Sequence, residues 1–111
     1  MRDARARRIA GNESRFREIN ERLEAGLRQL PDHGVPVDFI CECGDATCAA
    51  TVPVTLDEYE RVRQDPRLFV VAPGHELPDV EDVLVRTDSY VVVRKRAVEA
   101  PLVEETDPRS D

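Results

Sequence analysis

The sequence DFICECGDATC at residues 38–48 contains all three cysteines of this 111-residue chain. Cys41, Cys43 and Cys48 lie within eight positions, with a glycine and an aspartate between them. Thiolates at such a density are typical of a metal site. Two cysteines two positions apart are too far from each other along an ideal strand to share one ion. We therefore expect the backbone to bend at residues 42–44, where Gly44 permits it.

A tetrahedral zinc site needs a fourth ligand, and His75 in the sequence PGHE at residues 73–76 is the best candidate. The proline and the glycine before it predict a turn that allows close approach of the backbone. His33 is the alternative, although a lone histidine beside glycine in a proline-rich loop is more often solvated. The sequence predicts one zinc ion bound by Cys41, Cys43, Cys48 and His75. Four protein ligands leave no open position for water, so the predicted site is structural rather than catalytic.

The spacing alone does not fix the metal or its role. Cys-x-Cys-x4-Cys departs from the usual paired Cys-x2-Cys arrangement. An iron–sulfur or redox-sensing role, inert reduced cysteines, and a disulfide between Cys43 and Cys48 are the alternatives. Because oxidation of the thiolates would release zinc, a redox sensor would use the same four residues.

The formal net charge of −7 argues against a nucleic-acid binder that relies on whole-surface attraction to phosphate. Positive charge is concentrated at the N-terminus, where residues 1–30 carry eight arginines against five acidic residues. A nucleic-acid or transcription-linked role through Arg2, Arg5, Arg7 and Arg8 therefore stays open but is not favoured. The sequence has neither a membrane-length apolar run nor a signal peptide, which predicts a cytoplasmic protein.

Residues 1–30 are predicted to form an amphipathic helix, because helix-forming residues dominate from Arg5 to Leu30 without a proline. One apolar residue recurs every seven positions, and Ile19 and Leu27 extend the same stripe. The stripe is formed by Ile9, Phe16, Leu23 and Leu30. We expect this stripe to pack against the chain's own core. A helix-mediated dimer is the alternative, but Asn12 and Gly26 at the intervening heptad positions argue against it.

Residues 36–98 are predicted to form the zinc-binding α+β core. Strands are expected at 37–41, 49–54, 67–71, 80–86 and 90–94. Thr55 followed by Glu58 matches a capping box and predicts a short helix to about Gln64. Residues 99–111 are acidic and poor in apolar side chains, which predicts a disordered tail.

Several segments together resemble a family of small uncharacterised actinobacterial proteins, over roughly residues 10–96. The matching segments are Asn12-Glu13, FREINE at 16–21, FICECGD at 39–45 with Cys48, LDEYE-x-VR at 56–63, Pro66, F-x-V-x-PGHE at 69–76 and YVVV at 90–93. The resemblance implies no established activity. It implies that the cysteines and His75 act together, and that Asn12, Asn20 and the helix carrying Tyr59 belong to one structural design.

The sequence thus predicts an α+β fold: a long N-terminal helix, then a small, mostly antiparallel sheet with one short helix, stapled by zinc. The sequence contains no serine elbow, paired histidines or phosphate-binding glycine loop, so we do not expect the protein to be an enzyme. The predicted function is a zinc-stabilised interaction or regulatory module for an unidentified protein partner, as a monomer or a helix-mediated dimer. The alternatives are the nucleic-acid factor and the thiol redox or zinc sensor.

Overall fold

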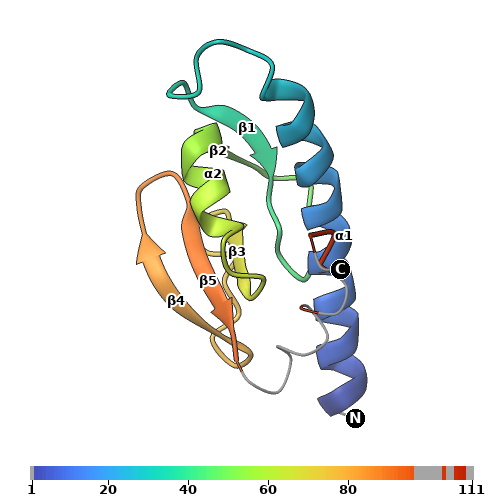
Figure 1. Ribbon diagram of the computed structural model, residues 1–111. Helices are drawn as coiled ribbons and strands as arrows, with labels where there is room; N and C mark the ends of the chain where they lie inside the picture. The colour runs from blue at the N-terminus through green and yellow to red at the C-terminus, as the bar shows by residue number, and fades with distance from the viewer. Residues whose placement is uncertain (1, 97–103, 105–106, 110–111) are drawn as a thin grey trace.

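A computed structural model describes residues 2–96, 104 and 107–109 (Figure 1). The predicted α+β fold is confirmed, with a long N-terminal helix, a short helix and small antiparallel sheets. The elements are α1 (Arg2–Leu27), β1 (Val37–Ile40), β2 (Thr51–Val54), α2 (Leu56–Val62), β3 (Leu68–Val71), β4 (Glu81–Arg86) and β5 (Val91–Lys95).

The strands form two sheets, whereas the sequence predicted one. β1 pairs with β2, and β5 lies between β3 and β4 in a separate three-stranded sheet. Every pairing is antiparallel. The chain passes from one sheet to the other just after β1, because the Cys41 N–H donates to the Ala50 carbonyl whereas the Glu42 N–H donates to the Val70 carbonyl. The cysteine-rich segment is therefore the link between the sheets.

The helix α2 packs its apolar face into the core between the sheets. Its buried side chains are Leu56, Tyr59 and Val62. The Tyr59 ring stacks on Phe39 of β1, with 4.4 Å between centroids. The predicted capping box is confirmed: the Glu58 N–H donates to the Thr55 hydroxyl at 3.0 Å, and the Thr55 N–H donates to the Glu58 carboxylate at 2.9 Å. Two helix-start donors are thereby satisfied.

The helix α1 buries a largely polar face, and the predicted apolar stripe is only partly confirmed, since Leu23 and Leu27 pack partly buried against the core. Ile9 is buried, but Ile19 is 47% exposed and Leu30 is 52% exposed. The residues that turn inward are Ala10, Glu13, Ser14, Arg17, Asn20 and Glu24. This face has the same helical spacing as a hydrophobic one. In the described part of the chain, no helix is both long and apolar enough to cross a membrane.

The polar face of α1 is buried because residues distant in the sequence provide partners for its charges. The Lys95 ammonium lies 2.7 Å from Glu13 and 3.2 Å from Glu81, and all three side chains are almost completely buried. The Arg17 guanidinium stacks on the Phe69 ring at 4.4 Å. Its Nη1 donates to the Pro66 carbonyl at 2.5 Å. Buried charges of this kind are tolerated when they are paired.

The predicted disordered tail, residues 99–111, falls mostly outside the described residues, namely at 99–103, 105–106 and 110–111. At the four described positions the structure differs from the prediction. Asp107 is 7% exposed and pairs with Arg63, and Glu104 lies 2.7 Å from Arg67. Composition did not predict these contacts, because they depend on Arg63 and Arg67, which lie about 40 positions earlier in the chain.

Candidate metal centre

The structure brings together the four residues that the sequence predicted as ligands. One donor atom from each of Cys41, Cys43, Cys48 and His75 lies within 4.8 Å of every other. The Nδ1 atom of His75 is 3.6 Å from the Cys41 sulfur and 3.5 Å from the Cys48 sulfur. These four residues could hold one metal ion.

The two distances from the His75 nitrogen to sulfur match a tetrahedral thiolate–imidazole site. Zinc–sulfur bonds of about 2.3 Å and zinc–nitrogen bonds of about 2.0 Å place sulfur and nitrogen about 3.5 Å apart at tetrahedral angles. The two distances from His75 agree with this value. Thiolate and imidazole ligands suit zinc as well as other metals that bind sulfur. The group therefore fits the predicted metal.

Cys41 and Cys43 are positioned by the link between the sheets. Residues 41–43 have left the strand conformation of β1, as the predicted bend required. The Ala72 N–H donates to the Cys41 sulfur at 3.1 Å, which orients this donor from the end of β3. Hydrogen bonds of this kind fix the orientation and charge of a metal ligand.

Cys48 is carried by a compact turn. The Cys48 N–H donates to the Asp45 carbonyl at 3.0 Å. The Asp45 carboxylate in turn accepts the Thr47 N–H at 2.9 Å and the Thr47 hydroxyl at 2.7 Å. These contacts lower the pKa of Asp45 below its ordinary value. An aspartate that bonds to the backbone two residues ahead stabilises a tight turn, which folds Cys48 back towards Cys43.

His75 is presented by a turn at the end of β3. The His75 N–H donates to the Ala72 carbonyl at 2.9 Å, and Gly74 has a φ of +88°. Proline at the second position and a positive φ at the third match a type II turn, in which glycine is strongly preferred. The Gly74 N–H also donates to Glu76 at 2.8 Å. The predicted proline–glycine turn is confirmed.

Glu42 anchors the two neighbouring cysteines in the core, a role that the sequence analysis missed. Its carboxylate is fully buried and accepts the Tyr59 hydroxyl at 2.6 Å, the Asn20 amide at 2.9 Å and the Val70 N–H at 3.1 Å. Burial raises the pKa of this carboxyl, and the three donors oppose that effect. A side chain held at three points fixes the backbone on both sides of it.

The helix α1 packs directly on the segment that carries the cysteines. The Asn12 amide donates to the Gly44 carbonyl at 2.8 Å. Asn20 donates to the Ile40 carbonyl at 2.8 Å and accepts the Ile40 N–H at 2.9 Å. A Cβ added at Gly44 would lie 2.4 Å from Ile9, so only glycine fits there. Asn12, Asn20 and Tyr59 thus all bond to the segment that carries the cysteines, at Gly44 or Glu42.

Burial dominates the electrostatics of the site. It raises the pKa of the Cys41 and Cys43 thiols, and each neighbouring thiol adds to the effect at Cys41. A divalent cation favours the thiolate form, because it neutralises charges that burial alone would suppress. A metal ion that binds sulfur would therefore stabilise the thiolate form of these cysteines.

Two of the alternatives, His33 as a ligand and a disulfide between Cys43 and Cys48, differ from the observed geometry. His33 lies apart from the cluster, with its Nε2 3.0 Å from the Arg28 carbonyl. All three cysteines are free thiols, so Cys43 and Cys48 form no disulfide.

Comparisons of the chain with protein-family models, with curated proteins and with solved structures found no match.

Proposed function

We propose that the chain is a small, non-enzymatic module in which one zinc ion fixes a protein-binding surface. The observation that carries this proposal is the gathering of three thiols and one imidazole within 4.8 Å of one another, with the imidazole nitrogen 3.5 and 3.6 Å from two of the sulfurs. When bound, zinc would cross-link the segment after β1, the 45–48 turn and the turn after β3. Because all four ligands would come from the protein, the ion would act structurally and leave no position for substrate.

The location of the cluster supports a structural role. It lies where the chain passes between two small sheets, and neither a two-stranded nor a three-stranded sheet has much area to hold itself together. A metal ion at this junction would supply stability that so small a core cannot. A rigid module of this kind suits recognition of another protein.

The proposal is tested by native mass spectrometry of tag-free protein and of two histidine variants. Wild-type protein is expected to carry one zinc ion per chain. His75→Ala should lose metal at chelator concentrations that wild-type protein withstands. His33→Ala is the matched control, since His33 contacts only a backbone carbonyl among the described residues, and it should retain metal. Equal retention by the two variants would contradict the assignment of His75.

A thiol sensor is the second candidate, because Cys48 is only partly buried while Cys41 and Cys43 are buried. An open hollow of about 270 Å³ lies beside the cluster and is lined by Cys43, His75 and Glu76 among others. Small oxidants could reach the site from this side. A sensor would release zinc stoichiometrically at micromolar peroxide, measured with a zinc-responsive dye. If zinc stays bound under that treatment, the sensor role is refuted and the structural role stands.

Nucleic acid remains the less favoured partner. Arg5 pairs with Asp79 at 2.7 Å, so part of the N-terminal positive charge is neutralised within the chain. A nucleic-acid role would require binding that weakens steeply with salt and that depends on Arg7 and Arg8, whose side chains are exposed.

A further inference from the structure

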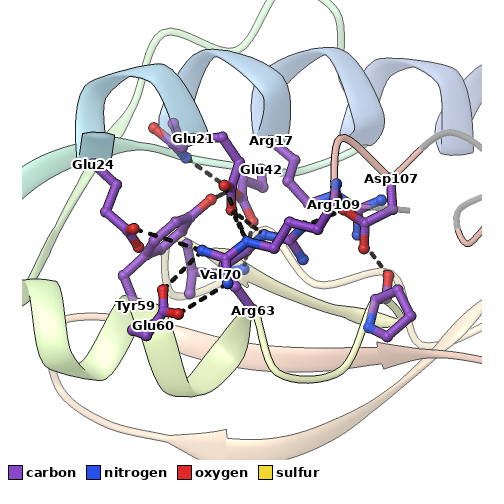
Figure 2. Close-up of polar contacts among 12 residues, drawn as sticks. Arg17, Glu21, Glu24, Glu42, Tyr59, Glu60, Arg63, Val70, Asp107 and Arg109 are labelled. Atoms are coloured by element: carbon purple, nitrogen blue, oxygen red, sulfur yellow. Dashed lines mark hydrogen bonds and ion pairs between the residues drawn. The ribbon is translucent and has the colours of Figure 1, made fainter. Parts of the chain in front are cut away.

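The described part of the C-terminal tail lies on a site with two oppositely charged regions, formed by α1 and α2. The positive region consists of Arg17 and Arg63, which are almost completely buried. The negative region consists of Glu21, Glu24 and Glu60. Figure 2 shows Arg109 extending between the two helices towards Glu24 and Glu60, with Asp107 at the other end of the group.

Asp107 occupies the positive region. Its carboxylate pairs with Nη2 of Arg63, and the side chains of both residues are nearly inaccessible to solvent. Arg63 also donates through Nε to Glu21 at 2.5 Å. Burial and the neighbouring Arg63 lower the pKa of Arg17, and the Asp107 carboxylate opposes that effect. An acidic side chain is therefore needed where two buried guanidinium groups approach each other.

Arg109 occupies the negative region. It donates to both oxygens of Glu60, at 2.9 and 2.7 Å, and to both oxygens of Glu21 at 3.1 Å. A third carboxylate, that of Glu24, lies 3.5 Å away. The paired contact with Glu60 has the fork geometry that selects arginine over lysine. The two regions together therefore accept a segment in which an acidic residue is followed two positions later by an arginine.

The contacts described between this segment and the helices are charged, and Pro108 and Arg109 remain exposed. Because the Arg109 side chain is 31% exposed and binds Glu21 and Glu60 through ionic contacts, another segment with the same charges can compete for this end of the site. Nη1 of Arg63 has no hydrogen-bond partner among the described residues, so the segment leaves one buried donor of the site unused. A competing acidic segment could use it.

We propose that this site binds a peptide segment of a partner protein, in which an acidic residue is followed two positions later by arginine, and that the chain's own Asp107-Pro108-Arg109 occupies it until the partner competes. This inference rests on the proposed function, since it names the surface through which that module binds its partner. The tail then acts as an internal competitor, which sets a threshold for partner binding.

The test uses a fluorescent peptide with the sequence of residues 104–111, EETDPRSD, and the zinc-loaded full chain. Fluorescence anisotropy compares wild-type protein with the Asp107→Ala/Arg109→Ala variant. The variant should bind the peptide at least about tenfold more tightly, because a tethered competitor acts at an effective concentration in the millimolar range. A control peptide with Asp107→Asn and Arg109→Gln should bind the variant at least about tenfold more weakly.

Equal affinity for wild-type protein and the variant, equal affinity for the two peptides, or no binding to the variant would overturn the inference. Circular dichroism checks that the variant is folded. If it is not, Arg109→Ala alone serves as the host, because the Arg109 side chain is 31% exposed and its removal empties only the negative region. Metal content is measured on the same samples. Loss of peptide binding with zinc retained would refute this inference alone, whereas absence of zinc from wild-type protein would refute the proposed function.

Discussion

Replacing Gly44 with alanine should destabilise the protein by about 2 kcal/mol, because α1 leaves no room for a side chain there. The added Cβ would lie 2.4 Å from Cγ2, 3.1 Å from Cβ and 3.2 Å from Cγ1 of Ile9. Ile9 is β-branched and sits on a helix, so it has almost no alternative rotamer into which it can move. The backbone of α1 or of the cysteine-rich segment must shift instead.

Two separate routes give a cost of this order. Overpacking in a close contact costs about 1–3 kcal/mol. If α1 moved away instead, exposure of Ile9 would cost about 2 kcal/mol, and loss of the Asn12 bond to the Gly44 carbonyl would add about 1 kcal/mol. Both routes weaken the contact between α1 and the segment that carries Cys43.

The assay is urea unfolding of zinc-loaded protein, followed by circular dichroism, with the free energy of unfolding taken from the midpoint and slope. Gly11→Ala is the matched control, because a Cβ at Gly11 meets nothing within 4 Å, and it should stabilise the protein by about 0.5–1 kcal/mol. In the double variant Ile9→Ala/Gly44→Ala the two losses should be less than additive. A Gly44→Ala protein as stable as wild type would refute the packing described here.

Three further predictions concern the supports of the site. Asn20→Ala should cost at least about 2 kcal/mol in urea unfolding, because it removes partners from the partly buried Ile40 backbone and from the buried Glu42 carboxylate. Asn12→Ala should cost about 1 kcal/mol, and equal costs would contradict this difference. The hydrogen bond from the Thr55 N–H lowers the pKa of Glu58 below its ordinary value of 4.5, so the ionised carboxylate stabilises the folded protein above pH 4.5 and this stabilisation is lost as the pH falls through the pKa of the folded state. The difference in the free energy of unfolding between wild-type protein and Glu58→Gln should therefore decrease as the pH is lowered from 6 to 3. A constant difference would refute the predicted direction. Chelation of the metal should lower the melting temperature by about 10 °C or more, and an unchanged melt would mean that the cluster adds no stability.

The sequence predicted elements whose signals are local. The capping box from Thr55 to Glu58 needs only four residues, and the turn before His75 needs only a proline and a glycine, so both could be predicted from the sequence. The cysteine cluster was equally local, since eight positions contain every thiol. His75 was identified by its residue type and its turn, without any knowledge of which strand would bring it near.

The buried face of α1 could not be predicted in this way. Hydrophobic periodicity assigns apolar residues to the interior and gives no reason to place Glu13, Arg17 or Asn20 there. Their burial depends on partners such as Lys95 and Glu42, which lie from 22 to 82 positions away along the chain. A pattern within one helix contains no information about such pairs.

The same limit applies to the two sheets and to the tail. The strands were predicted close to their observed bounds, but the division between β1–β2 and β3–β5–β4 depends on which strands pair. Asp107 and Arg109 were read as part of a solvated acidic tail, because the residues that bind them are on α1 and α2. Complementary charge across a long separation becomes visible only when the fold is known.

The most direct test of the metal centre is zinc K-edge X-ray absorption of the tag-free protein. The proposed site predicts three sulfur atoms at about 2.3 Å and one nitrogen at about 2.0 Å from a single zinc ion. His75→Ala should remove the nitrogen contribution, whereas His33→Ala should leave the spectrum unchanged. A first shell of oxygen and nitrogen atoms without sulfur, or protein that binds no zinc with three reactive thiols, would contradict the assignment of Cys41, Cys43, Cys48 and His75 as the ligands.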